Sequence, residues 1–283
     1  MADQAQRLRE LVGNRREIRV VTVSSGKGGV GKSSITVNLA VALSRLGIRV
    51  LVVDADFGLA NVDVMLGVTA RYNISHFLNG DKKLHDIIQQ GHEGVRFISG
   101  GSGLNELIRM SEDQLAGIIT GLQHIDAPVD FIFIDTGAGI NDNILQMILA
   151  SSETIMVTAT EPTALLDAYA LVKMIVNQDS GHPIHVLVNK SENKKEAESV
   201  QEGFIDVAGK HLGKSINPIG TVMYNADVPR SIKQQIPITV SAPDCGTSRE
   251  IAAIARNILE LPEARQPEKV LYQIFCRMFG GKR

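Results

Sequence analysis

The sequence predicts an α/β protein in which helices cover both faces of a doubly wound, mostly parallel sheet, with an amphipathic helical appendage at each end. Short β-branched runs alternate with helical stretches along most of the 283 residues. Several of these runs are apolar almost throughout, which is typical of strands covered on both faces. A glycine-rich loop lies between the first run and the first helical stretch. Ligands of such a sheet bind beyond the carboxyl ends of its strands.

The predicted elements follow one another in regular alternation. The expected strands are Arg19–Ser24, Arg49–Asp54, Val95–Ser99, Phe131–Asp135, Thr154–Thr158 and Ile184–Asn189. The clearest helix candidates between them are Ser33–Leu46, Asn141–Ser151 and Leu165–Val176. Both terminal stretches fall outside this alternation, and prolines 262 and 267 separate the second one from the rest. We therefore expect an N-terminal segment (residues 1–17), one central domain (18–262) and a C-terminal segment (263–283).

The composition excludes several classes of protein. Hydrophobic residues make up 44% of the chain and charged residues 21%, so the chain can bury a core. The net charge of -2 and the absence of tryptophan argue against a nucleic-acid partner. Cys245 and Cys276 lie too far apart in sequence for a metal or disulfide framework. Since no apolar run approaches the roughly 20 residues of a spanning helix and Met1 begins no secretory signal, we expect a cytoplasmic protein.

The loop after the first strand has the spacing of a phosphate-binding P-loop. Residues 26–33 fit the pattern G-x-x-x-x-G-K-[ST] between a strand and a helix. In such a loop, backbone N–H groups surround the phosphate oxygens and the helix N-terminus adds positive partial charge. Lys32 would contact the β- and γ-phosphates, and the Ser33 hydroxyl would bind Mg²⁺. The predicted nucleotide-binding residues here are Gly26, Gly28, Gly29, Val30, Gly31, Lys32, Ser33 and Ser34.

Lys27 is a second lysine that the P-loop pattern does not require. With it, residues 27–33 resemble the deviant Walker A motif of the MinD/ParA family. The resemblance implies a P-loop NTPase of the MinD-like (SIMIBI) kind, and a slow, Mg²⁺-dependent ATPase that forms a homodimer with ATP. In that family the first lysine reaches across the dimer to the partner's phosphates, so the resemblance assigns Lys27 a catalytic role in trans.

Three carboxylates follow predicted strands. If the second strand continues far enough, alternation sends the side chains of Asp54 and Asp56 to the same side. The segment from 54 to 63 resembles a family motif, which implies that Asp56 activates the attacking water and that Asp54 supports the metal. Asp135 closes an apolar run in the manner of a Walker B strand and would hold Mg²⁺ through a water. Residues 136–140 resemble the family's switch II.

The site of the nucleobase is less specific in the sequence. Asn189 follows a predicted strand and resembles the family's base-contacting asparagine. Residues 189–192 also partly resemble the N-K-x-D motif of GTPases, with Glu192 in place of aspartate, so GTP stays an alternative to ATP. Lys27 and the second-strand acids favour ATP. Residues 217–220 and 227–229 look like later family segments near the base.

The C-terminal segment has the pattern of a basic amphipathic helix. Apolar residues recur at spacings of one and four from Val270 onward and would cover about half of a helix. Such a helix either inserts into an anionic membrane surface or packs on its own core. The resemblance to the membrane-targeting helix of MinD-like proteins favours reversible attachment to the inner face of the cell membrane. The predicted membrane residues are Leu271, Ile274, Phe275, Met278 and Phe279.

The N-terminal segment indicates one branch of the family. Residues 3–9 resemble the D-Q-A-x-x-L-R segment of the FlhG branch, whose members act in flagellar biogenesis. There the segment activates a GTPase of the signal-recognition type, FlhF, which makes Gln4, Leu8 and Arg9 candidate partner contacts. The resemblance implies control of flagellar number and placement, with basal-body (C-ring) or regulatory proteins as further partners. The alternatives are a frayed helix at this terminus, a division-site MinD, a DNA-partitioning ATPase and a nucleotide-binding scaffold with negligible turnover.

Overall fold

The strands form one eight-stranded sheet with the order β3-β4-β2-β5-β1-β6-β7-β8. The structure, a computed structural model, describes residues 18–56, 61–101 and 129–261. The strands are β1 (Arg19–Ser24), β2 (Val50–Ala55), β3 (Gln89–Gln90), β4 (Arg96–Ile98), β5 (Phe131–Thr136), β6 (Glu153–Ala159), β7 (Ile184–Ser191) and β8 (Asn217–Met223). Neighbouring strands pair in parallel, and β3 with β4 is the antiparallel exception among them. The predicted doubly wound, mostly parallel α/β sheet is confirmed, and the predicted helices at the two ends of the chain lie outside the described residues.

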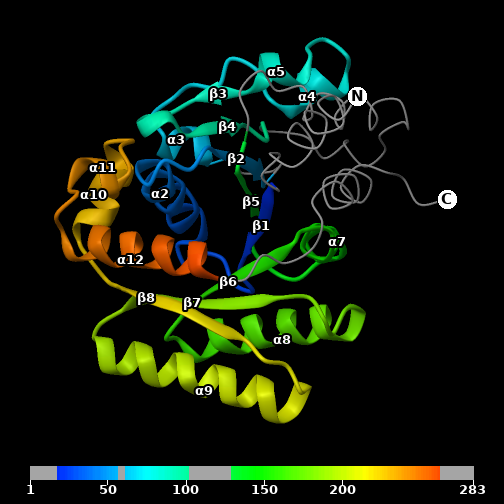
Figure 1. Cartoon of the computed structure of the whole chain (residues 1–283), viewed down its shortest axis with the longest axis vertical. Coiled ribbons are helices and arrows are strands. Elements are labelled where there is room, and N and C mark those ends of the chain that lie inside the picture. Colours follow the sequence, from blue (N-terminus) through cyan, green and yellow to red (C-terminus); the bar gives the residue numbers. More distant parts are fainter. Residues whose placement is uncertain (1–17, 57–60, 102–128, 262–283) are drawn as a thin grey trace, which may run out of the picture.

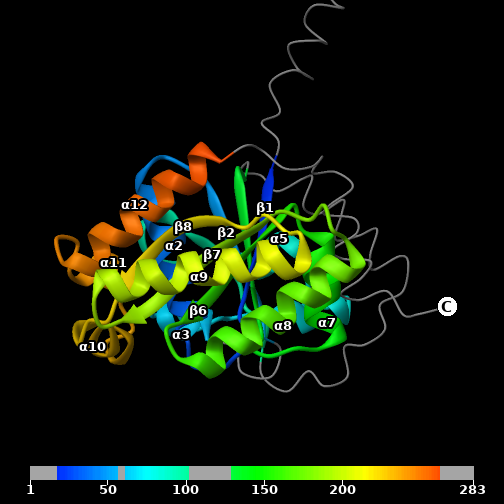
Figure 2. The ribbon, with the colours of Figure 1, turned by 90° about the horizontal axis from the view of Figure 1, so that it is seen from below.

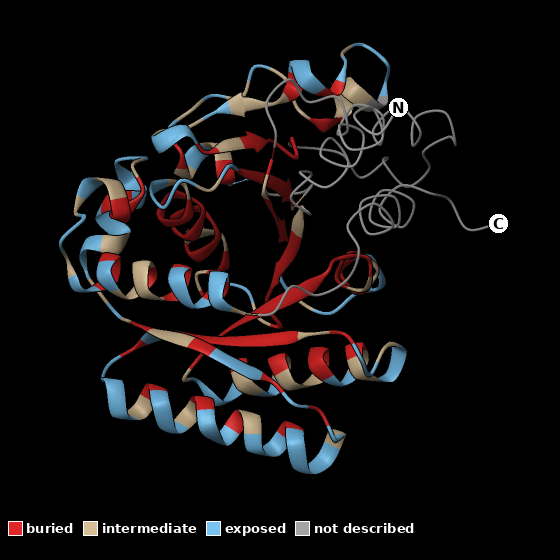
Figure 3. Ribbon diagram, in the orientation of Figure 1, coloured by how far each residue is buried: buried red, intermediate tan, exposed pale blue. Residues whose placement is uncertain are grey.

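Helices cover both faces of this sheet (Figure 1 and Figure 2). The helices are α2 (Lys32–Arg45), α3 (Val62–Met65), α4 (Ile74–Leu78), α5 (Leu84–Ile87), η1 (His92–Gly94), α7 (Asp142–Ala150), α8 (Pro162–Gln178), α9 (Lys194–Leu212), α10 (Asp227–Lys233), α11 (Ile238–Ser241) and α12 (Gly246–Glu260). On one face, α2 and α12 pack together over the central strands. On the other face, α7, α8 and α9 pack on β6 and β7. Figure 3 shows buried strands between helices whose outer sides are exposed.

The six predicted strands and three predicted helices all occur, and each predicted boundary lies within three residues of the observed one. β8 has no counterpart among the predicted strands, because Pro218 and Gly220 interrupt its apolar pattern. A proline is tolerated there since β8 is an edge strand, where one side of the backbone needs no ladder hydrogen bond. The central strands β2, β5 and β6 are buried at every residue, as covered parallel strands should be.

The register of the sheet brings distant segments to its carboxyl edge. Asp54 of β2 lies beside Asp135 of β5, and Asp135 lies beside Val23 of β1. The loop that follows β1 therefore leaves the sheet directly next to these two carboxylates. This edge contains the candidate site.

A buried charge cluster occupies the opposite, amino edge. The Arg19 guanidinium makes a bidentate ion pair with Glu153, whose side chain is 1% exposed. His185 Nε2 lies 2.7 Å from Glu153 Oε2, and Arg19 Nη1 donates to the carbonyl of Ile258 at 2.6 Å. The cluster thus joins the first residues of β1 and β6, the second residue of β7, and the last turn of α12.

Among the described residues, no helix combines the length and the apolarity that crossing a bilayer requires. The predicted N-terminal segment and residues 263–283 of the predicted C-terminal segment lie outside the described residues. The described chain starts at Ile18, next to Arg19, and ends at Leu261, just after α12.

Replacing Glu153 by alanine should lower the free energy of unfolding by about 3–5 kcal/mol, because Arg19 and His185 would lose their buried carboxylate. Urea unfolding at neutral pH measures this loss. Glu198→Ala is the matched control: its pair with Lys194 is exposed, and its loss should cost less than about 0.5 kcal/mol. Equal losses in both variants would contradict the importance of the cluster.

The same variant should change the acid limb of the stability curve. Burial alone would raise the pKa of Glu153, but hydrogen bonds from His185 and Arg19 outweigh burial and hold the pKa below its ordinary value of 4.5. The stabilisation is therefore complete above pH 4.5 and is lost as the pH falls through the folded-state pKa. Glu153→Ala should lack this loss when unfolding is repeated at lower pH.

Candidate functional site

The first residues of the loop between β1 and α2 pack tightly against the rest of the fold. Gly31, at the N-cap position of α2, has φ of 90°, a left-handed conformation that glycine adopts without steric cost. A Cβ on Gly26 would lie 2.2 Å from the backbone carbonyl carbon of Asp167, so this glycine packs directly on α8. Val30 is buried, whereas Gly28 and Gly29 are exposed. The loop therefore presents its middle residues outward from a fixed base.

Lys32 and Asp135 form a buried ion pair at the start of α2. The distance from Lys32 Nζ to Asp135 Oδ1 is 2.8 Å, and the side chains are 7% and 1% exposed. Thr36 Oγ1 donates to the same carboxylate oxygen at 2.9 Å. Lys32 Nζ also lies 3.4 Å from Ser33 Oγ. The P-loop lysine, the P-loop serine and the predicted Walker B aspartate therefore meet in one place.

The second carboxylate oxygen of Asp135, Oδ2, has an unusual environment at the base of the loop. Asp135 Oδ2 and the Ser25 hydroxyl are buried and have no hydrogen-bond partner within the described part of the chain. A buried polar atom without a partner destabilises a fold by about 1–3 kcal/mol. A carboxylate oxygen and a hydroxyl such as that of Ser33 are ligands of the kind that Mg²⁺ takes. The residues at this position therefore fit a magnesium ion or one of its waters.

Asp54 anchors the loop that follows β2. Its Oδ1 accepts from the N–H of Asp56 at 3.1 Å, and its Oδ2 accepts from the N–H groups of Asn61 and Val62 at 2.8 and 3.1 Å. Burial is the main cause that raises the pKa of Asp54 to about 7; the Val62 N–H opposes it and the neighbouring charge of Asp135 adds to it. Both carboxylate oxygens are engaged with backbone, and a metal role for Asp54 stays a prediction.

Asp56 lies beside the segment that follows β5. The strand β2 ends at Ala55, so Asp56 begins the loop instead of continuing the strand alternation. A Cβ on Gly137 would lie 3.6 Å from Asp56 Oδ1. The N–H of Gly139 donates to the Ser25 carbonyl at 3.0 Å. The half-buried Asp56 carboxylate is thus next to the predicted switch, and that switch is hydrogen-bonded to the start of the P-loop.

Lys27 lies at the surface of the site. Its Nζ donates to Glu161 Oε2 at 2.7 Å and to Thr163 Oγ1 at 2.8 Å. The side chains of Lys27 and Glu161 are 37% and 66% exposed, so the ion pair is of the weak, solvent-screened kind. Glu161 and Thr163 are not among the predicted site residues. The proline between them signalled only the start of a helix, and their closeness to Lys27 arises from the packing of α8 beside the loop.

Two consecutive residues at the end of β7 also contact the loop. The Asn189 amide donates to the Val30 carbonyl at 2.8 Å, and Lys190 Nζ donates to the Gly29 carbonyl at 2.6 Å. Asn189 is buried against the loop, and a Cβ on Gly31 would lie 2.5 Å from its amide nitrogen. The predicted base contact of Asn189 stays a prediction. Lys190 lies within the predicted partial N-K-x-D motif but is not itself among the predicted site residues.

Other predicted residues fall elsewhere. Ser34 is half-buried in the first turn of α2, and its carbonyl accepts from the Asn38 side chain at 2.8 Å. The predicted partner contacts (Gln4, Leu8, Arg9) and membrane residues (Leu271, Ile274, Phe275, Met278, Phe279) lie outside the described residues.

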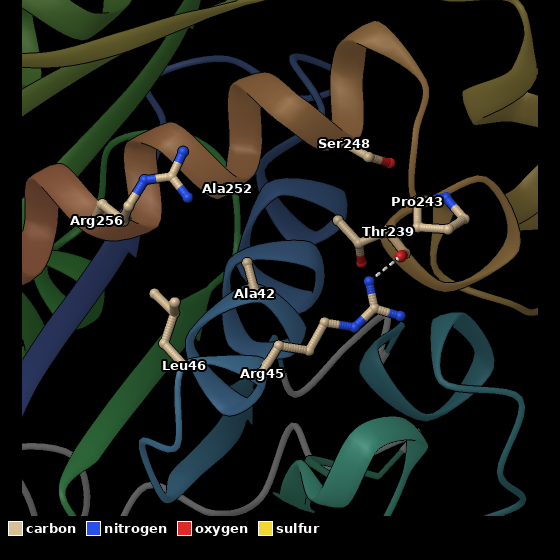
Figure 4. A pocket seen from close by; sticks show the side chains of 8 residues that line it. All are labelled: Ala42, Arg45, Leu46, Thr239, Pro243, Ser248, Ala252 and Arg256. Atoms are coloured by element: carbon tan, nitrogen blue, oxygen red, sulfur yellow. Dashed lines mark hydrogen bonds between the residues drawn. The ribbon is translucent and has the colours of Figure 1, made fainter.

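A cavity of about 120 Å³ lies between α2, α11 and α12 (Figure 4). Its lining includes Arg45 at the end of α2 and Arg256 of α12. Arg45 Nη1 donates to the Thr239 carbonyl at 2.6 Å. Because Arg45 is at the opposite end of α2 from Lys32, this cavity is not part of the loop site.

A glycine-rich loop between a strand and a helix, with a lysine and a strand-end aspartate meeting at its base, defines a P-loop nucleoside triphosphatase. The family model described as "ParA: NUBPL iron-transfer P-loop NTPase" matches residues 17–259. The chain therefore belongs to the ParA family of P-loop NTPases, and it is an ATPase.

Individual relatives agree with this assignment. The antiactivator FleN of Pseudomonas aeruginosa is 34% identical over 257 residues, which cover 90% of this chain and 91% of FleN. The flagellum site-determining protein YlxH of Helicobacter pylori is 31% identical over 291 residues, which cover 98% of each protein. The predicted resemblance to MinD/ParA-type ATPases, and within them to the FlhG branch that includes FleN and YlxH, is confirmed.

A solved structure agrees in fold. The septum site-determining protein MinD of Pyrococcus horikoshii, complexed with Mg-ADP, superimposes with a TM-score of 0.68 at 24% identity. The match covers 86% of this chain and 96% of that MinD.

Replacing Gly26 by alanine should displace the P-loop, because the new Cβ would meet the backbone of Asp167, which cannot rotate away. We expect a loss of about 2 kcal/mol or more in the free energy of unfolding and a loss of Mg-ADP binding, measured by urea unfolding and by titration. Gly28→Ala is the matched control for stability: its nearest neighbour is the Ala138 side chain at 3.8 Å. If the two variants are equally stable, the tight packing at Gly26 is wrong.

Proposed function

We propose that this ATPase is a slow, Mg²⁺-dependent switch that dimerises with ATP, associates reversibly with a membrane, and regulates the number and placement of flagella. The single observation that carries the switch is the position of Lys27, a surface lysine of the P-loop whose partners are themselves exposed. The similarity to FleN and YlxH supports the flagellar setting.

ATP binding would rearrange the buried ion pair. Lys32 pairs with Asp135 and lies within reach of Ser33. Triphosphate oxygens carry more charge than one carboxylate, so Lys32 would move to the β- and γ-phosphates. Asp135 would then hold Mg²⁺, directly or through a water, with Ser33. Mg²⁺ when bound neutralises charge on the phosphates, and Asp135 Oδ2, which has no hydrogen-bond partner in the described part of the chain, supports its position.

Asp56 would orient the attacking water. Its carboxylate lies next to Gly137, at the start of the segment that joins β5 to α7. A hydrogen bond from the Gly139 N–H joins that segment to the start of the P-loop. Loss of the γ-phosphate would therefore change the backbone conformation of the segment. A carboxylate in this position would accept a proton from water as the water oxygen bonds to the γ-phosphorus and the bond from that phosphorus to the bridging oxygen breaks, releasing ADP.

Lys27 would act on the partner's nucleotide. The ion pair with Glu161 is exposed, and such pairs are worth less than about 1 kcal/mol. A buried triphosphate in a dimer interface offers a stronger partner, so closure of the dimer would draw Lys27 away from Glu161. Supplied in trans, its charge would stabilise the transition state and couple hydrolysis to dimerisation.

The terminal segments would carry the partners. The basic amphipathic pattern from Val270 onward supports attachment to an anionic membrane, and the segment from 3 to 9 supports stimulation of an FlhF-type GTPase. The chain leaves the described fold at Ile18 and Leu261, and the hydrogen bond from Arg19 to Ile258 keeps these two exits at the amino edge of the sheet. Both segments would therefore start away from the nucleotide.

Asp56→Ala should accumulate an ATP-bound dimer, because binding and closure remain while water activation is lost. Lys27→Ala should stay monomeric with ATP and Mg²⁺. Glu161→Gln should dimerise at lower ATP concentration than the wild type, because it removes the ion pair that competes for Lys27. Light scattering coupled to size exclusion measures the oligomer, and phosphate release measures hydrolysis.

Glu198→Gln is the matched control for the Glu161 variant, since it neutralises an exposed carboxylate whose lysine partner, Lys194, is remote from the loop. If the wild type, Lys27→Ala and Asp56→Ala remain monomeric and equally active, the proposed switch is wrong.

Two truncations should separate the terminal functions. Removing residues 263–283 should abolish co-sedimentation with anionic liposomes and leave stimulation of an FlhF-type GTPase intact. Removing residues 1–17 should do the reverse, so each truncation is the control for the other. Salt-sensitive binding of the full chain to nonspecific DNA, with no liposome binding, would favour a DNA-partitioning ATPase instead.

A further inference from the structure

Lys190 adopts a strained backbone conformation at the end of β7. Its φ is 59°, in the left-handed region, and only two other non-glycine residues of the described chain, Glu93 and Gln235, share that region. Such conformations are unfavourable for a residue with a Cβ and persist where the surroundings impose them. The pairing of β7 with β8 is irregular between Val188 and Ser191, so Lys190 lies within a local break of the ladder.

The irregular backbone lets two neighbouring side chains reach the same loop. In a regular strand, the side chains of Asn189 and Lys190 would point to opposite faces of the sheet. Here Asn189 donates to the Val30 carbonyl and Lys190 donates to the Gly29 carbonyl. The strained conformation at Lys190 is what makes this joint contact possible.

These contacts fix the direction of two N–H groups. The Gly29 carbonyl and the Val30 N–H belong to one planar trans peptide and point in opposite directions. The same holds for the Val30 carbonyl and the Gly31 N–H. When β7 holds both carbonyls, both N–H groups are turned away from β7 and are free of these contacts, and N–H groups of this kind surround phosphate oxygens in a phosphate-binding loop. Asn189 is uncharged, whereas Lys190 makes the shorter, charge-assisted bond.

We propose that Lys190 is a nucleotide-positioning residue: its ammonium holds the Gly29–Val30 peptide so that the Val30 N–H is directed at a nucleotide phosphate. The inference rests on the proposed nucleotide chemistry of this loop and adds a residue to it. Lys190 acts through the backbone of the loop and not by touching the substrate. The charge of Lys190 also acts on Glu161. The pKa of Glu161 is lowered mainly by its hydrogen bond with Lys27, and the charge of Lys190 adds to this lowering.

Substitutions of Lys190 by methionine, arginine and glycine test this inference. Titration with a fluorescent ADP analogue and Mg²⁺ measures the nucleotide affinity of each variant, and thermal unfolding without nucleotide measures its stability. Lys190→Met, which keeps the stem and removes the ammonium, should weaken binding about tenfold, as expected for a lost charge-assisted hydrogen bond. Lys190→Arg should restore most of the affinity. In steady-state hydrolysis, Lys190→Met should raise KM about tenfold and leave kcat within about twofold.

Lys190→Gly distinguishes positioning from a purely structural role. Glycine relieves the left-handed strain, so the melting temperature should rise by about 2 °C while nucleotide affinity falls about tenfold. Gln235→Gly is the matched control: it relieves the same strain at φ 57°, in the turn after α10, and should gain stability with unchanged affinity.

The outcomes are distinct. If the wild type binds Mg-ADP and the Lys190 variants bind it equally well, the positioning role is overturned. It is also overturned if Lys190→Met and Lys190→Gly lose stability in proportion to affinity. If the wild type binds neither ADP nor ATP, the proposed function fails together with this inference.

Discussion

The planar peptide of the P-loop is the constraint on which the site depends. To gather N–H groups around a phosphate, the loop must turn the matching carbonyls outward, and each of these needs a partner because unpaired backbone groups are costly. The chain meets this requirement with residues far away in sequence: Asn189 and Lys190 hold the carbonyls of Val30 and Gly29. Gly26 rests on the backbone of α8, and Gly31 takes the left-handed turn into α2. The loop is therefore shaped from outside as much as by its own glycines.

Electrostatics divide the site into a buried and an exposed part. In the buried part, Lys32 neutralises Asp135, and burial keeps Asp54 protonated at higher pH than an ordinary aspartate. Under the proposed function, an incoming anion would take Lys32 and its metal would take Asp135, so both charges would keep an opposite partner. In the exposed part, Lys27 has a partner that water screens. Breaking the exposed pair of Lys27 and Glu161 costs little free energy. The buried pair of Lys32 and Asp135 would separate only when each partner gains a stronger ligand.

The buried charge cluster and the candidate site lie at opposite edges of one sheet. The amino edge is closed by Arg19, Glu153 and His185, with the end of α12 tied to Arg19. The carboxyl edge contains two unfavourable features: Asp135 Oδ2, which has no hydrogen-bond partner among the described residues, and the left-handed backbone of Lys190. Such local penalties persist when the rest of the fold is stable enough to impose them. Parallel strands make this division possible, because all of their carboxyl ends lie on one side.

The sequence by itself determined the local features of this protein. The alternation of apolar runs predicted the strands and helices, and the spacing around Lys32 predicted a phosphate loop. The apolar run that Asp135 closes predicted a metal-binding carboxylate, because all of these depend on backbone periodicity and on short motifs. Only the tertiary structure decided which further residues meet that loop. Glu161 and Thr163 reach Lys27 because α8 packs beside it, and Lys190 reaches Gly29 because β7 lies in the same sheet and is irregular at its end. No spacing rule predicts such contacts, since 134 to 161 residues separate the partners. They arise when the packing of the whole core fixes where each strand and helix ends.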